Sequence, residues 1–412
     1  MQKVKALGDA GKLEQADALL DKILAGLQAE EIGALAKNKR RGPASSVPAT
    51  TGTSEITLAG APDHGIFDPS IARDGTGPLY MSLSGVASTT SGGSFGTHAV
   101  RTYLASSRDQ GKSWQISGII NNDIEVTLGK APANGRWQSE VSTLVFDAHA
   151  PKQGRWKLIW HQYLDINGDR KFEHGWIAYK EAETPNALVA AKPVKLFTAA
   201  AYDAINDTVT GWTRSPIRGV GVNKLHQFAP VLQGCLLITE PGLLSKADAL
   251  YLSLVCFKSG LGGVASDVVL LKCAHPCNAA APGAWAYVGT ALTPADSQAL
   301  GLGKFSGSGL FSDNGKDYIV VSPVGNTPVP EAYKGCNVFR FADIASGEIE
   351  REANGRPSPA TSVSMNADSF NGACAFLPAG ADKGLLIGRV DFVKVANGAD
   401  ATFHIFRSNV SP

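Results

Sequence analysis

Three acidic side chains stand at comparable places along the chain, each beside a short apolar stretch. Asp68, Glu140 and Glu240 are each followed by a turn-like gap and then by an aromatic-rich stretch, at residues 79–83, 156–160 and 250–254. If the three carboxyls meet, a protonated one can donate to a leaving oxygen while an ionised one activates water or attacks carbon. Like charges in one pocket oppose ionisation of all three, so at least one should stay protonated. The pattern predicts carboxylate acid/base catalysis.

Repeated hairpins separated by long stretches are typical of radial β architecture. A propeller blade begins with its innermost strand, so residues at the entrances of these strands converge on the central axis. Five hairpin starts are found, and we predict an all-β fold, a five-bladed β-propeller, with blades over residues 65–121, 137–200 and 226–292 and two more starting near 307 and 371. The three acids then face one central pocket.

The N-terminal residues differ from the rest. Residues 1–42 carry apolar side chains at helical spacing, which predicts a short α-helical extension. Residues 43–54 are a linker poor in large apolar groups, and residues 55–412 make up the propeller. The helix either packs on the outside of the propeller or docks a partner or a second subunit.

Composition limits the partners. The 412 residues include 38 Lys+Arg and 37 Asp+Glu, a formal net charge of +1 that gives no general attraction to nucleic acid. There is no run of about 18 apolar residues, so we expect no membrane span. Residues 1–42 lack the apolar core of a signal peptide, which indicates either an intracellular protein or a processed or truncated chain.

Six cysteines lie in the C-terminal half and can form three disulfides in fifteen possible pairings. This even set favours a secreted or periplasmic protein. Cys273 and Cys277 can close a small loop; alternatively they form a metal site with His275, or all six stay reduced and buried. We predict no metal at the catalytic site.

Two further motifs predict turns. Ser107–Trp114 matches the S-x-D-x-G-x-x-W Asp-box of sialidase-like propellers, in which Asp109 holds the hairpin backbone and has a structural role. Asp165, Asn167 and Asp169 alternate like a calcium loop, but the glycine is displaced and Trp176 stands where a glutamate is required. A polar hairpin turn is favoured, no cofactor is expected, and a structural Ca²⁺ is the alternative.

The sequence around the three acids resembles glycoside hydrolase family 43 and its five-bladed invertase-like and arabinanase-like relatives. The resemblance is carried by Asp68-Pro69 before 79–80, Glu140 before 156–160, and Glu240-Pro241 before 250–251. It implies that Asp68 is the general base, Glu140 the orienting and tuning carboxylate, and Glu240 the general acid. Glu140 stands where Asp is usual, and Glu240 is followed by Pro-Gly instead of Gly-Pro.

Other polar and aromatic residues near the strand entrances are candidates for binding the carbohydrate substrate, although each also fits an ordinary structural role: His64, Trp137, His161, Ser308 and Asn371. Two alternatives remain. A sialidase-like hydrolase would need a Tyr nucleophile and an arginine clamp, for which Arg73, Arg136, Arg218 and Arg389 are available. A non-catalytic propeller that binds glycans or proteins has the same fold.

Overall fold

The computed structural model describes residues 52–412, apart from 90–97, 129–133, 167–168, 199–201, 204–207, 210–212, 215–216, 218–222, 259–264, 325–332, 366–369, 379–382 and 396–397. The predicted helical extension, with the docking role proposed for it, and most of the predicted linker lie outside the described residues.

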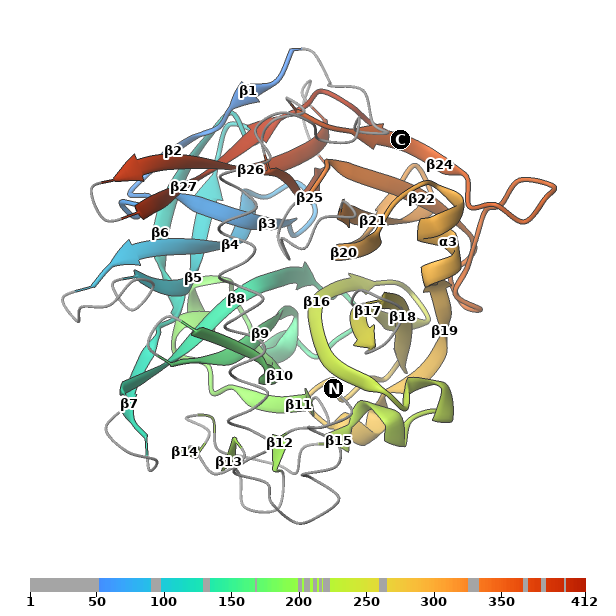
Figure 1. Ribbon diagram of the computed structural model, residues 1–412, viewed down its shortest axis with the longest axis horizontal. Helices are drawn as coiled ribbons and strands as arrows, with labels where there is room; N and C mark the ends of the chain where they lie inside the picture. The colour runs from blue at the N-terminus through green and yellow to red at the C-terminus, as the bar shows by residue number, and fades with distance from the viewer. Residues whose placement is uncertain are drawn as a thin grey trace. The chain divides into compact units, whose positions relative to one another are not determined.

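The described chain is a five-bladed β-propeller, as the sequence predicts, and its blades follow one another around a central axis (Figure 1). The innermost strands are β3 (Ile66–Ala72), β8 (Asn134–Phe146), β16 (Cys235–Ser245), β20 (Lys304–Asp313) and β25 (Phe370–Leu377).

From the axis outward, each blade continues by antiparallel pairing. Blade one adds β4 (Leu79–Ser88), β5 (His98–Ser107) and β6 (Ser113–Asn121); blade two adds β9 (Trp156–Ile166), β10 (Asp169–Ala182) and β11 (Val194–Thr198). Blade three adds β17 (Ala249–Lys258), β18 (Ala265–Ala274) and β19 (Ala286–Leu292); blade four adds β21 (Lys316–Val324), β22 (Cys336–Asp343), β23 (Glu348–Ile349) and β24 (Pro359–Val363). Blade five adds β26 (Gly384–Val395) and β27 (Gly398–Arg407).

Smaller elements complete the described chain. They are β7 (Ile124–Thr127), which pairs with β8; β15 (Asn223–Lys224), which pairs with β11; the small sheet β12 (Tyr202–Asp203), β13 (Thr208–Val209) and β14 (Thr213–Arg214); and helix α3 (Pro294–Ala299). Among the described residues, no helix has the length and apolar character needed to cross a membrane.

Two short N-terminal strands connect the beginning of the described chain to its end. β1 (Ser54–Glu55) pairs antiparallel with β27 in blade five, and β2 (Thr57–Ala59) pairs parallel with β6 at the outer edge of blade one. The chain therefore ties the first blade to the last through backbone hydrogen bonds, which gives the edge strands partners.

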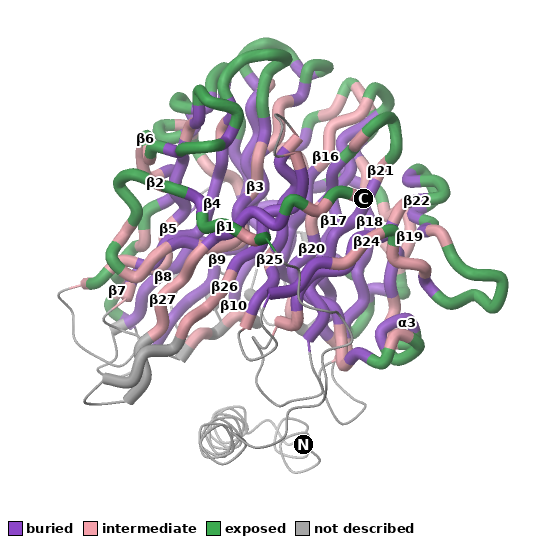
Figure 2. Tube along the Cα trace, turned by 90° about the horizontal axis from the view of Figure 1, so that it is seen from above, coloured by how far each residue is buried: buried purple, intermediate pink, exposed green. Residues whose placement is uncertain are grey.

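Most side chains packed between the blades are apolar, although some polar ones, such as Lys157 and His161, are buried among them. β9 is buried along its whole length, and β17 is buried except for its last residue. In Figure 2 the buried residues follow the strands, whereas exposed residues gather in the turns. Burying aliphatic and aromatic side chains on both faces of these sheets is the main stabilising contribution.

All six cysteines are paired. Cys235–Cys256 joins neighbouring strands of blade three, Cys273–Cys277 closes the predicted small loop, and Cys336–Cys374 joins blade four to blade five. The reduced-thiol alternative is therefore wrong. The metal alternative for Cys273, His275 and Cys277 is wrong as well, because the two sulfurs are bonded to each other.

The hairpin at Ser107–Trp114 has the contacts expected of its residues. Asp109 accepts hydrogen bonds from the hydroxyl of Ser107 and from the backbone N–H of Ser113, and Gly111 adopts φ 85°. The indole of Trp114 donates to the carbonyl of Gly111 at 3.0 Å. The hydrogen bonds from Ser113 and Ser107 hold the pKa of Asp109 below its usual range. Asp109 has a structural role here.

A β-bulge recurs at the same place in all five innermost strands. The pairing with the second strand of the blade shifts register between residues 67 and 70, 140 and 143, 239 and 242, 306 and 309, and 372 and 375. In every bulge one residue is left-handed: Asp68 (φ 48°), Val141 (51°), Glu240 (56°), Gly307 (59°) and Ala373 (50°). The bulge is thus a structural repeat that marks equivalent positions in the blades.

Candidate functional site

The bulges surround a small cavity on the central axis. Its volume is about 70 Å³, which is room for a few water molecules. Asp68 of blade one and Glu240 of blade three both line it, together with Ser308 of blade four. Two of the three predicted catalytic acids therefore come to one place, although they are 172 residues apart in the sequence (240 − 68).

The backbone at both acids has an unusual conformation. Left-handed backbone in a residue other than glycine costs roughly 1–3 kcal/mol and persists only when the surroundings impose it. Asp68 and Glu240 share this conformation, and a proline follows each of them inside the bulge. Because a bulge re-aims the side chain that it carries, it accounts for how both carboxyls reach the axis.

The Asp68 carboxylate is held from blade one and connected to blade two. The hydroxyl of Ser84 on β4 donates to Asp68 Oδ2 at 3.2 Å, and the Ser84 Oγ in turn accepts a hydrogen bond from the backbone N–H of Val141 at 2.9 Å. Asp68 itself is half-buried. The arrangement suits a carboxylate that stays ionised, because its hydrogen-bond donor is already oriented.

Glu240 is held at two points besides its bulge. The hydroxyl of Tyr333 donates to Glu240 Oε1 at 3.3 Å, and the hydroxyl of Ser308 donates to the Glu240 carbonyl at 2.6 Å. Ser308 also lies 3.1 Å from the hydroxyl of Ser253. Ser308 thus fixes the backbone of the predicted acid.

Glu140 occupies a different place in the repeat from the other two acids. The left-handed residue of its bulge is Val141, so Glu140 stands one position earlier and is not among the residues that line the cavity. Its side chain is buried and accepts a hydrogen bond from the hydroxyl of Tyr163 at 3.0 Å. Burial first, and then the charge of Glu140, raises the pKa of Tyr163 well above its usual value, so this phenol stays protonated and remains a donor.

In blades four and five, the residues expected to match the catalytic acids are not at the equivalent positions of the bulge. The residues equivalent to Asp68 are Gly307 and Ala373, and not Ser308 and Asn371. Ser308 follows the left-handed position and Asn371 precedes it by two residues. The amide oxygen of Asn371 accepts from the backbone N–H of Met365 at 2.9 Å, so this buried side chain is engaged with the chain that follows β24 of blade four.

Two of the predicted substrate-binding residues are buried in the protein interior. Trp137 is fully buried and packs on Trp176 with ring centroids 4.6 Å apart, so it presents no free face to a sugar. His161 is also fully buried, with Nδ1 3.1 Å from the hydroxyl of Thr239 on blade three. Both predictions are corrected for the same reason: the side chains fill the space between blades.

His64 stands at the start of the first inner strand, as predicted. Its Nε2 lies 3.0 Å from the hydroxyl of Ser88 and 2.9 Å from Nε2 of His98. The side chain of His64 is 15% exposed, which leaves part of the imidazole open at this end of the blade. It is the predicted histidine that solvent reaches.

Sequence reasoning did not find the hydrogen bonds that Ser84, Tyr163 and Tyr333 make to the three acids. Ser84 and Tyr163 lie on second strands, where alternation alone cannot tell a side chain that reaches an acid from one that packs. Tyr333 comes from the connection between β21 and β22 and is 93 residues from its partner Glu240. No local pattern marks it.

Metal ligands do not gather in the described part of the chain, where no three His, Cys, Asp or Glu side chains are placed to hold an ion. In the alternative calcium loop, Asn167 lies outside the described residues. The strands on either side of it pair up to Ile166 and Asp169, as in a tight hairpin.

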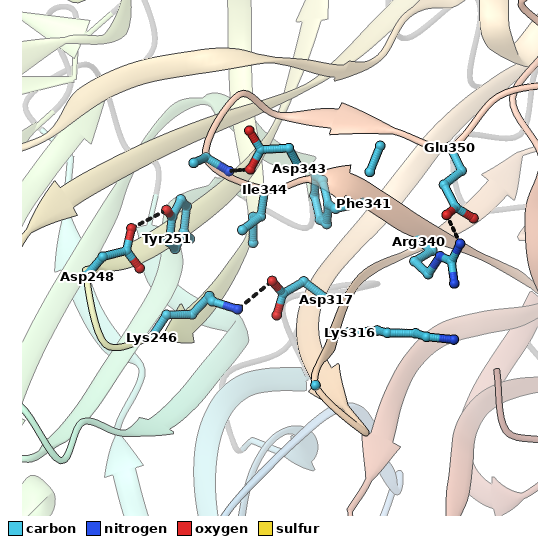
Figure 3. Close-up of a pocket in the computed structure, with 13 residues that line it drawn as sticks. Lys246, Asp248, Tyr251, Lys316, Asp317, Arg340, Phe341, Asp343, Ile344 and Glu350 are labelled. Atoms are coloured by element: carbon cyan, nitrogen blue, oxygen red, sulfur yellow. Dashed lines mark hydrogen bonds and ion pairs between the residues drawn. The ribbon is translucent and has the colours of Figure 1, made fainter.

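A larger cavity of about 490 Å³ lies between blades three and four, at the strand ends opposite the entrances (Figure 3). Most of its charged groups are engaged with each other. Lys246 pairs with Asp317 at 2.5 Å, Tyr251 donates to Asp248 at 2.7 Å, and Arg340 pairs with Glu350. We assign these contacts to the packing of neighbouring hairpins, and place the candidate active site at the smaller axial cavity where the bulges meet.

Comparisons with known proteins give structural neighbours only. No family model matches the chain, and no curated protein sequence matches it. Similar solved structures include the catalytic domain of a family 62 α-L-arabinofuranosidase from Coprinopsis cinerea, with 12% identity, 87% of this chain and 98% of that chain covered, and a TM-score of 0.46.

Two other neighbours have the same level of similarity. A family 117 glycoside hydrolase of the marine bacterium Zobellia galactanivorans has 10% identity, covers 88% of this chain and 91% of its own, and gives a TM-score of 0.48. A family 32 β-fructofuranosidase of Bombyx mori has 12% identity, covers 96% of this chain and 66% of its own, and gives 0.44. Their names describe glycoside hydrolases; the function of the present chain has to be argued from its own residues.

Proposed function

We propose that the protein is a glycoside hydrolase whose reaction takes place at the axial cavity. The observation that carries the proposal is that Asp68 and Glu240, from two different blades, line one cavity and share the same left-handed bulge position. Strained backbone at two carboxylates facing one site is typical of catalytic groups. The sequence resemblance assigns the same two residues as base and acid.

In the proposed reaction Glu240 donates its proton to the glycosidic oxygen as the bond from that oxygen to the anomeric carbon breaks. Asp68 takes a proton from the water that attacks the anomeric carbon, or attacks that carbon itself in a retaining enzyme. In the inverting case the proton taken up by Asp68 is exchanged with solvent and Glu240 is reprotonated. In the retaining case Glu240 then takes a proton from a water that attacks the anomeric carbon and breaks its bond to Asp68, so that one water is consumed for each glycosidic bond cleaved in either case. The axial cavity has room only for water, so we expect the sugar ring to bind above it, on the side of the strand entrances.

Glu140 takes a supporting role in this proposal. It is buried beside the bulge residue Val141, whose N–H binds the same Ser84 hydroxyl that donates to Asp68. Its carboxylate accepts a hydrogen bond from the phenol of Tyr163, which fixes its direction. We assign it to orientation and tuning, and not to proton transfer with the substrate.

The test is a panel of aryl glycosides and polysaccharides, assayed with wild type, Glu240→Gln and Asp68→Asn. For the matched control, Glu183→Gln removes a carboxylate that pairs with Lys152 at the surface. Removing a general acid or base should lower kcat/KM by about 10²–10⁴-fold, while the control retains wild-type activity. Glu240→Gln should lose much less on substrates with a good leaving group, which needs no proton.

One observation favours a sialidase-like reaction as the second candidate. The Tyr333–Glu240 contact is the type of Tyr–Glu pair that such a reaction uses. Of the arginines considered for a clamp, Arg136 pairs with Asp123 and Glu125, and Arg389 pairs with Asp391. Arg73 follows the far end of β3, and Arg218 lies outside the described residues. Selective cleavage of sialosides that is lost in Tyr333→Phe as well as in Glu240→Gln would select this candidate.

The three disulfides also bear on the compartment in which the protein works. Three disulfides are typical of proteins that function outside the reducing cytoplasm, so we propose a secreted or periplasmic enzyme. If a folded wild-type protein cleaves nothing on the panel but binds glycans, it is a non-catalytic propeller instead.

A further inference from the structure

We infer that Tyr333 is a positioning residue for the acid Glu240 and that position 372 requires glycine because a larger side chain there would clash with Tyr333. The inference rests on the proposed function, because it assigns a role around the proton donor of that reaction. It starts from blade five, where the residue before the left-handed position is a glycine.

The residue immediately before the left-handed position is Phe67 in blade one, Glu140 in blade two, Thr239 in blade three and Ser306 in blade four; we call it the pre-bulge position. In blade five the pre-bulge residue is Gly372. A Cβ placed on Gly372 would lie 2.7 Å from Cβ of Tyr333 and 2.9 Å from its Cδ2. These distances are shorter than van der Waals contact allows. Tyr333 therefore occupies the space that the blade five side chain would otherwise fill.

Tyr333 is fixed in this place by its backbone. The backbone N–H of Asn371 donates to the carbonyl of Tyr333 at 3.2 Å, and Tyr333 forms an isolated bridge with Val324 at the end of β21. The next residue, Lys334, donates to the carbonyl of Pro323 at 2.8 Å. These bonds attach the residue to both blade four and blade five, so its backbone position is set by the packing of the two blades.

The phenol then reaches across to blade three. Its hydroxyl donates to Glu240 Oε1 at 3.3 Å and lies 3.5 Å from the hydroxyl of Ser306. When one carboxyl oxygen accepts a hydrogen bond, the proton is left to the other oxygen, Oε2, which is then the one that can donate it. Three blades thus cooperate in aiming one acid, and a donor to the ionised form also stabilises the carboxylate that remains after proton transfer.

The experiment compares Tyr333→Phe, Tyr333→Ala and Gly372→Ala with wild type on the best substrate of the panel. Tyr333→Phe keeps the ring and loses the donor, so kcat should fall roughly 10- to 100-fold with KM little changed. Because the ionised form of the acid loses its donor, the alkaline fall of the pH–rate profile should move upward by roughly one unit. Gly372→Ala should change the profile in the same direction by displacing Tyr333.

The outcomes separate the two proposals. If the wild type has no glycosidase activity, the proposed function fails. If the wild type is active and Tyr333→Phe reproduces its kcat, KM and pH profile, the inference is wrong while the proposed function stands. A role in packing alone predicts that only Tyr333→Ala and Gly372→Ala are impaired, with an unshifted profile, and that result overturns the inference too. If any variant fails to fold, Tyr333→Phe, the least disruptive, decides.

Discussion

The hydroxyl of Ser84 lies 3.2 Å from the carboxylate of Asp68 and donates a hydrogen bond to it. Ser84 is fully buried on the second strand of blade one, and its oxygen also accepts the backbone N–H of Val141 from blade two. One hydroxyl therefore connects the proposed base to the bulge of the neighbouring blade. The position of the base depends on the packing of two blades, and not on its own loop alone.

Replacing Ser84 by alanine should harm both activity and stability. Asp68 loses a donor that favours its ionised form, so the acidic fall of the pH–rate profile should move upward and kcat/KM should drop about tenfold. The N–H of Val141 loses its partner, which should lower the free energy of unfolding by about 1–3 kcal/mol.

The control for this variant is Ser117→Ala, since the Ser117 hydroxyl lies on the outer strand of blade one and donates to the backbone carbonyl of Leu104 instead of to an acid. It should leave the pH profile unchanged. Equal profiles for Ser84→Ala and wild type would show that Ser84 does not influence the base.

Much of the fold could be predicted because local chemistry agrees with it. Asn314 and Gly315 take φ 49° and 73° at the turn between β20 and β21, as an Asn-Gly pair in a hairpin requires. The start of blade one, predicted near Gly65, agrees with a β3 that begins at Ile66. Turn residues and apolar strands carry these predictions by themselves.

The sequence could not predict which residue of each innermost strand takes the left-handed position in the bulge. The left-handed residues are Asp, Val, Glu, Gly and Ala, so no residue type marks the position, and tertiary pairing decides it. Glu140 stands one residue before the left-handed position, so it is not equivalent to Asp68 and Glu240. The burial of Trp137 was missed for a related reason: an aromatic residue at a strand entrance packs between blades or faces the axis according to the twist of the sheet. Tyr333 reaches Glu240 through tertiary contacts only.

The repeated bulge predicts opposite effects for two small substitutions. Ala373 is left-handed, and an L side chain there costs roughly 1–2 kcal/mol, so Ala373→Gly should raise the free energy of unfolding by about 0.5–1 kcal/mol after the entropic cost of glycine. Gly307→Ala should lower it by about 2 kcal/mol, because the new Cβ would meet the Ser322 hydroxyl at 2.8 Å. Urea denaturation measures both. A change of the same sign in the two variants would contradict the assigned strain.

Burial of His161 predicts a specific dependence of stability on acid. Burial lowers the pKa of His161 from 6.5 to about 3. Between these values the unfolded chain binds a proton that the folded chain does not, so the free energy of unfolding falls as the pH drops from 6.5 towards 3. The contribution is up to about 1.4 kcal/mol per pH unit.

His161→Gln removes this titration, so its free energy of unfolding should fall less steeply than that of wild type over the same pH range. His226→Gln, at an exposed position, provides the matched control and should follow wild type. Denaturant unfolding at several pH values between 3 and 7 gives the comparison. Parallel curves for wild type and His161→Gln would mean that His161 is protonated in the folded state.

The three disulfides should differ in their contribution to stability according to the length of chain that each one closes. The paired cysteines are separated by 38 residues in Cys336–Cys374, 21 in Cys235–Cys256 and 4 in Cys273–Cys277. The loss of loop-closure entropy in the unfolded chain then predicts stabilisation of about 4, 3 and 2 kcal/mol, respectively. Double Cys→Ala variants, compared by urea denaturation, should follow this order.

Cys374 also lines the axial cavity, so only removal of Cys336–Cys374 should lower activity at temperatures where the variant is still folded. If Cys273→Ala/Cys277→Ala proved the most destabilised variant, packing of that loop against blade three, and not chain entropy, would dominate.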